Sequence, residues 1–249
     1  YSDTNYISLF YKPSNATTTH NISINGTSGK VSYGISGRYY TQEGIYKLGH
    51  EDYDAFHFRT KLKVQVKDWL SIDNNTSVYK MDYIQPIFSK NDGNVGSQLR
   101  QIAMMGVPCI PVYNEDGTYT VAAAAGGYAA FNDGNSAQED HRLTLTTSMG
   151  VTVEPIRDVF NIRGEFAFKS TRRGLDRYVT PVAYSVSPGA MTDYVKQVDS
   201  YYRYYDYNTE HVTANLVGTF TPKLGENHKL NVVGGWNLEN NVYHRRGTF

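Results

Sequence analysis

Alternation of apolar and polar side chains is the feature that most constrains this chain, and it is clearest between Phe56 and Val66. One set of alternate residues reads Phe, Phe, Thr, Leu, Val, Val, and the other reads His, Arg, Lys, Lys, Gln. Successive side chains of a β-strand point to opposite faces, so this pattern predicts a strand with one apolar and one polar face. The same alternation returns at residues 20–25, 31–39, 70–80, 142–153, 160–168, 212–220 and 230–238. We therefore predict an all-β protein with about eight strands and no long helix.

The connections between these predicted strands alternate in length. Short turns rich in Gly, Pro, Asp or Asn lie at residues 26–30, 67–69, 154–158 and 222–229. Long connections cover residues 41–54, 82–140 and 171–210. Strands of about 9 to 11 alternating residues, joined in this way, are typical of a transmembrane β-barrel. The alternative is a soluble β-sandwich, whose strands average only about 5 to 6 residues.

Composition and motifs exclude several other classes. The 24 Lys and Arg residues balance the 24 Asp and Glu residues, so the chain lacks the excess positive charge that is typical of nucleic-acid-binding proteins. The single Cys109 excludes a disulfide framework, and the His residues show no ligand pair four positions apart, so we predict no metal site and no cofactor. No catalytic signature such as Gly-x-Ser-x-Gly is present, and an enzyme is not expected. Three acidic turns, at 91–94, 114–117 and 132–135, lack calcium-loop spacing and are interpreted as ordinary turns.

The order of turns indicates where the two ends of the chain lie. The first predicted strand enters a short turn and the last one leaves a short turn, so both ends are expected on the side of the long connections. Complete outer-membrane barrels normally keep both ends on the other side, and we interpret the chain as a piece of a larger barrel. At about 31 residues per strand, a barrel of 22 strands would need roughly 685 residues.

Two segments resemble the SusC/RagA family of TonB-dependent transporters. The first, residues 20–39, reads HNISINGTSGKVSYGISGRY and is followed by Gln42-Glu43-Gly44-Ile45. The second, residues 108–119, reads PCIPVYNEDGTY and is similar to the family's Pro-x-x-Pro-Val-Tyr segment in a long extracellular loop. Both occur in the family's order. The resemblance spans nearly the whole chain and about a quarter of such a transporter, and it implies strands two to nine of the barrel.

The resemblance implies an antiparallel transmembrane β-barrel segment in the bacterial outer membrane, about eight strands of a 22-stranded plugged barrel. Residues 1–19 are expected to end an extracellular loop, and residues 20–249 to carry the strands, short periplasmic turns and long extracellular loops. The plug domain and the TonB box are not found in this sequence.

The same resemblance implies the function of the whole protein. It is expected to import oligosaccharides, or less often peptides, with a SusD-like surface lipoprotein as lid and TonB as energy source, as in polysaccharide utilisation. Two alternatives stay open: a small independent outer-membrane barrel with a structural or adhesive role, and a soluble carbohydrate-binding β-sandwich.

Two groups of side chains are candidate functional residues. The first is expected to face the barrel lumen, where its members contact a substrate, the plug or one another: Arg38, His57, Arg59, Lys61 and Arg163. The second precedes the strand predicted to start near His211, and its rings are candidates to stack on sugar rings: Tyr201, Tyr202, Arg203, Tyr204, Tyr205 and Tyr207. The competing interpretation of this cluster is an aromatic girdle at the membrane interface.

Overall fold

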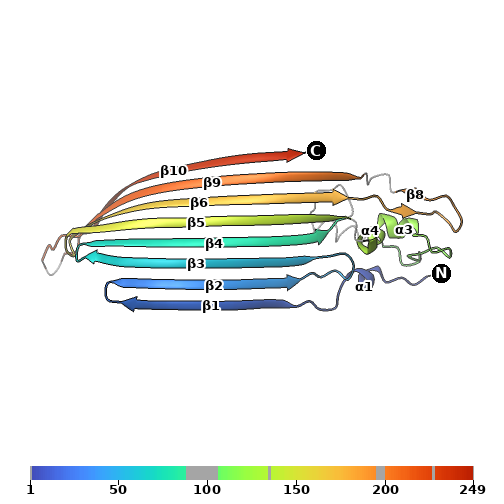
Figure 1. The fold of residues 1–249 in the computed structure, drawn as a ribbon, viewed down its shortest axis with the longest axis horizontal. Helices are drawn as coiled ribbons and strands as arrows, with labels where there is room; N and C mark the ends of the chain where they lie inside the picture. Colours follow the sequence, from blue (N-terminus) through green and yellow to red (C-terminus); the bar gives the residue numbers. More distant parts are fainter. Residues whose placement is uncertain (1, 88–105, 134–135, 195–199, 226–227, 249) are drawn as a thin grey trace.

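One antiparallel sheet dominates the structure, a computed structural model that describes residues 2–87, 106–133, 136–194, 200–225 and 228–248. Its eight strands lie in the order β1-β2-β3-β4-β5-β6-β9-β10, so each strand pairs with the next long strand of the chain (Figure 1). This confirms the predicted all-β class. Among the described residues β1 and β10 form the two edges of the sheet.

The long strands contain between 12 and 20 residues. Their bounds are Thr17–Ser28 (β1), Val31–Glu43 (β2), Asp52–Lys67 (β3), Leu70–Pro86 (β4), Ala137–Ile156 (β5), Phe160–Val179 (β6), Tyr201–Phe220 (β9) and Val232–Thr248 (β10). Ala183–Tyr184 (β7) and Asp193–Tyr194 (β8) form a separate small hairpin. The described residues also form three short helices, Tyr6–Phe10 (α1), Val121–Ala125 (α3) and Tyr128–Asp133 (α4). No helix in the described ranges is long and apolar enough to cross a membrane.

Several strands run well beyond the predicted bounds. β9 begins at Tyr201 rather than near His211, and β6 continues to Val179 rather than ending near Phe168. The predicted connection over residues 171–210 is therefore wrong: its two ends pair in register from Thr171 opposite Thr209 to Val179 opposite Tyr201. The alternation disappears there because both faces of these strand ends carry polar side chains, while the backbone ladder continues unchanged.

Short turns join the strands at one end of the sheet, and the longer connections lie at the other end, together with both ends of the described chain (Figure 1). The turn between β1 and β2 is narrower than predicted, because Ser28 pairs with Val31 and leaves only Gly29 and Lys30 unpaired. Gly29 has a φ of 56°, a left-handed conformation that glycine adopts without a Cβ penalty.

The two faces of the sheet differ in chemistry. The apolar face carries large exposed side chains on many strands, and its members include Ile22, Phe58, Leu145, Phe166 and Trp236. Trp236 is 57% exposed and Ile22 70% exposed. A β-sandwich would bury such a face beneath a second sheet. In the described part of the chain no second sheet covers it, so the sandwich alternative is wrong.

A cluster of buried apolar side chains lies in the long connections, while smaller numbers of buried apolar residues, such as Met81 and Val179, lie on strands. We call the group in the connections the loop cluster: Tyr6, Phe10, Tyr46, Ala129, Ala130, Phe131 and Val182. The Phe131 ring makes edge-to-face contacts with Phe10 at 5.5 Å and Tyr46 at 5.0 Å. Burial in this cluster raises the pKa of Tyr6 and Tyr46. The described parts of the long connections therefore pack together at one end of the sheet.

One of the acidic turns ties two of these connections together. Tyr113 bridges to Tyr119 around residues 114–117, as expected for a turn. Asp116 accepts hydrogen bonds from the Thr118 hydroxyl at 2.6 Å and from the Gly189 N–H at 2.7 Å, and these bonds lower its pKa. The turn at 91–94 lies outside the described residues, and the one at 132–135 lies only partly within them.

Candidate functional site

The five residues predicted to face the lumen share the face opposite the apolar one, which we call the polar face. Arg38 of β2 pairs directly with His57 of β3, and Arg59 and Lys61 follow at alternate positions of β3. Arg163 lies on the same face of β6. The registers therefore bring the first four together on neighbouring strands and place Arg163 three strands away. Whether this face lines a lumen stays a prediction.

Charge is unevenly divided between the two faces. Strand positions on the polar face carry a large excess of Lys and Arg, namely Arg38, Arg59, Lys61, Lys63, Arg142, Arg163, Lys169, Arg173, Arg177, Arg203 and Arg245. The acidic residues at strand positions of this face are fewer, namely Asp73, Asp140, Glu165 and Glu239. The whole chain is neutral, yet this face is strongly positive and favours anionic ligands.

Arg163 lies at the centre of an ion-pair network on this face. Its guanidinium donates to both carboxylate oxygens of Asp73, at 2.7 and 3.1 Å, and to Glu165 Oε2 at 3.0 Å. Gly150 faces this network, and a Cβ at Gly150 would lie 2.6 Å from Arg163 Nη2 and 2.7 Å from Asp73 Oδ1. The missing side chain therefore provides the space that the network occupies.

Substitution Gly150→Ala is expected to lower the free energy of unfolding by about 1 kcal/mol, because the new methyl group displaces charge-assisted hydrogen bonds that are partly screened by solvent. Gly164→Ala is the control. Its Cβ would meet only Leu216 Cδ1 at 3.9 Å, so this change is expected to raise stability by about 0.4–1 kcal/mol. Urea unfolding of the full-length protein measures both changes. Equal stabilisation by the two alanines would contradict the network.

The tyrosine cluster divides between the two faces of β9. Tyr201, Arg203, Tyr205 and Tyr207 lie on the polar face, whereas Tyr202 and Tyr204 lie on the apolar face, where the Tyr202 hydroxyl donates to Asp176. The cluster is thus part of a strand and does not form a single surface. Whether the two apolar-face tyrosines belong to an aromatic girdle at the membrane interface stays a prediction.

On the polar face, arginines already cover the tyrosine rings. The Arg245 guanidinium lies 4.8 Å from the Tyr205 ring and 5.6 Å from the Tyr207 ring, and Arg173 lies 5.6 Å from the Tyr207 ring. Arg173 also forms a bidentate pair with Asp140, at 2.8 and 2.5 Å. These cation–π contacts leave less free ring surface for a sugar than the sequence alone indicates.

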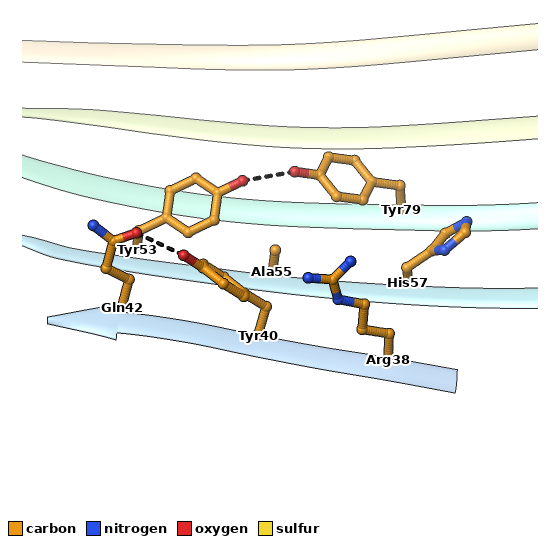
Figure 2. Close-up of a pocket in the computed structure, with 7 residues that line it drawn as sticks. All are labelled: Arg38, Tyr40, Gln42, Tyr53, Ala55, His57 and Tyr79. Carbon is orange, nitrogen blue, oxygen red and sulfur yellow. Dashed lines mark hydrogen bonds between the residues drawn. The ribbon is translucent and has the colours of Figure 1, made fainter. Parts of the chain in front are cut away.

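A second feature of the polar face is a hollow of about 490 Å³ over β2, β3 and β4. Its wall consists of Arg38, Tyr40, Gln42, Tyr53, His57 and Tyr79, with Ala55 as its floor (Figure 2). We call it the Ala55 hollow. The Tyr53 and Tyr79 hydroxyls hydrogen-bond at 2.8 Å, and the Tyr40 hydroxyl donates to Gln42 Oε1 at 2.6 Å. The volume lies within the range of small-ligand sites, about 300–1,000 Å³.

Among these residues, only Arg38 and His57 were predicted from the sequence as candidate functional residues. Tyr40, Gln42 and Tyr53 lie beyond the predicted strand bounds, and Tyr79 and Ala55 reach the hollow only through the register of three strands. The available signal was the order Tyr53, Ala55, His57 at alternate positions, a small residue between two large ones.

No family model matches this sequence, and no curated protein matches it. Solved structures do. The chain is similar to the RagAB peptide transporter, with a TM-score of 0.67 and 15% identity over 99% of this chain. The fold is therefore that of an antiparallel β-barrel segment. The RagAB peptide importer in its "closed-closed" state gives a TM-score of 0.66 at 15% identity, and its "open-open" state gives 0.66 at 16% identity.

The similarity covers nearly all of this chain but only part of the transporter. The chain spans 27% of the length of each of these structures. At this level of identity the match establishes the fold, and it agrees with the family resemblance of residues 20–45 and 108–119 only coarsely.

Proposed function

We propose that this chain is part of a TonB-dependent outer-membrane importer of the SusC/RagA kind, which takes up oligosaccharides together with a SusD-like lipoprotein. The observation that carries the proposal is the eight-stranded sheet with one exposed apolar face, similar over its whole length to a barrel transporter. On this proposal the protein moves its cargo and does not modify it chemically.

The proposed orientation follows from the chemistry of the two faces. The apolar face meets lipid, where a Lys or Arg at mid-depth costs about 2–4 kcal/mol. The polar face lines the barrel interior, where its cations meet the plug, water and cargo. The edges at β1 and β10 support further strands on both sides, since unpaired backbone groups are costly in a bilayer. The same open edges argue against a small closed barrel made of these strands alone.

The long-connection end is the proposed extracellular side, where the loop cluster packs the described parts of the connections together. In the proposed mechanism, cargo is captured between these connections and the lipoprotein lid, and TonB then drives displacement of the plug. Import of peptides is the second candidate, because the similar solved structures are described as peptide transporters.

The test begins with detergent extraction of the native outer membrane and capture of the polypeptide that carries this sequence. We expect a denatured mass above roughly 77 kDa, scaled from 28.1 kDa for eight strands to 22, and a copurifying lipoprotein. Deletion of the gene is then expected to abolish growth on one oligosaccharide class and not on peptides. A 28.1 kDa species alone, or recovery only from the soluble fraction, would overturn the proposal.

A further inference from the structure

The Ala55 hollow is a three-by-three arrangement of polar-face side chains with alanine in the middle. Arg38, His57 and Tyr79 form one row across β2, β3 and β4, and Gln42, Tyr53 and Tyr83 form another. Between them, Ala55 is paired with Tyr40 on one side and Met81 on the other. A methyl group surrounded by large side chains leaves a recess whose rim is mostly planar rings (Figure 2).

The rim of the hollow carries one positively charged side chain, Arg38, and its N–H groups are available to a ligand. The Arg38 guanidinium lies 5.6 Å from the Tyr40 ring, and it donates no hydrogen bond to any residue that the structure describes. On the polar face of β1–β4 the only acid at a strand position is Asp73, and its oxygens are bound by Arg163. Glu51, immediately before β3, accepts hydrogen bonds from the Tyr83 hydroxyl and from the Ile45 N–H. Arg38 is therefore free to pair with an anion brought by a ligand.

We propose that the Ala55 hollow is a subsite for a sugar ring that carries a carboxylate, an inference that rests on the proposed import function. The cargo would then be an acidic oligosaccharide. The planar guanidinium of Arg38 matches a carboxylate in bidentate geometry, and the contact with Tyr40 holds it in place. The Tyr53 and Tyr79 rings give the sugar an apolar surface, and the hydroxyl oxygens of Tyr40, Tyr53 and Tyr79 accept hydrogen bonds from its hydroxyl groups. The positive polar face concentrates such an anion near the site.

The same geometry disfavours a peptide at this position. Peptides commonly bind a sheet by adding a strand to a free edge. β2, β3 and β4 are each paired on both sides, so their backbone groups are already used in the ladder. The hollow therefore offers side-chain hydroxyls and one cation, and it offers no free edge.

The test measures binding by calorimetry to the full-length protein, purified with its lipoprotein partner. The probes are trisaccharides of galacturonate, glucuronate and mannuronate, the methyl ester of each, and triglutamate. We expect at least one acid to bind at least tenfold more tightly than its ester. Arg38→Gln is expected to remove that difference, and Ala55→Met, which fills the hollow, to weaken the acid and its ester alike.

Two matched variants serve as controls outside the hollow. Lys169→Gln removes one positive charge from the same face, and Ala167→Met enlarges another polar-face alanine, both on β6. Both are expected to stay within twofold of the native affinity. Esters that bind as tightly as acids, or equal losses for Arg38→Gln and Lys169→Gln, would overturn the subsite.

Two further results would also overturn the proposal. Tighter binding of triglutamate than of every acidic sugar would assign the hollow to a peptide. Absence of binding by all probes would remove the subsite, while the mass and partner measurements would still decide the importer function separately.

Discussion

Replacing Phe166 with arginine is expected to lower the free energy of unfolding of the full-length protein by about 2–4 kcal/mol. Phe166 lies on the apolar face of β6, between Met149 and Ala214, and is 51% exposed. If this face meets hydrocarbon, the guanidinium loses its hydration without gaining a hydrogen-bond partner. Urea unfolding in lipid vesicles measures the difference.

The adjacent residue provides the matched control. Ala167 lies on the polar face of the same strand, between Ser148 and Thr213, so Ala167→Arg adds the same charge at the same depth on the opposite side. Its effect is expected to stay below about 1 kcal/mol, as for most solvated positions. Similar losses for the two variants would show that the apolar face does not contact lipid.

Replacing Phe131 with alanine is expected to destabilise the loop cluster by about 3–5 kcal/mol, since the side chain is fully buried and its removal leaves a cavity. Opening of the long connections then becomes more frequent, and external protease is expected to cleave them at least a hundredfold faster. The unfolding midpoint of the sheet should not change, because the cluster lies outside it.

Phe131→Leu separates lost volume from other effects of the substitution. Leucine fills most of the same space, so protease is expected to cleave the Phe131→Leu variant at a rate close to that of the native protein. If the alanine variant is also cleaved at the native rate, the cluster does not hold the connections together.

The sequence predicts the sheet best where one face is apolar. Between Phe56 and Val66 the alternation marks both the strand and its two faces, and the structure confirms both. Outside the parts of the strands that have an apolar face, as at Tyr201–Tyr207, side chains on both faces are polar or amphipathic. The pattern there does not indicate that the strand continues. Backbone pairing with β6, which the pattern does not reveal, extends β9 to Tyr201.

The loop cluster and the Ala55 hollow escaped prediction for a different reason. Phe10 and Phe131 are far apart in the sequence, and neither belongs to a periodic segment. Tyr40, Ala55 and Tyr79 meet only because three strands pair in one register, and a shift of a single residue would move each to the other face. Arg38 and His57 were predictable as polar-face residues, but the recess beside them, around Ala55, was not.

The neighbour-to-neighbour order of the strands also bears on how the sheet assembles. Each hairpin can form from adjacent sequence and then present its outer edge as a template for the next one, so most pairings close short loops. A longer connection separates β6 from β9, and the longest one separates β4 from β5, whose ends are at Pro86 and Ala137. Loop-closure entropy grows with length, so the step that joins β4 to β5 is expected to be the slowest pairing and to divide assembly into two halves, β1–β4 and β5–β10.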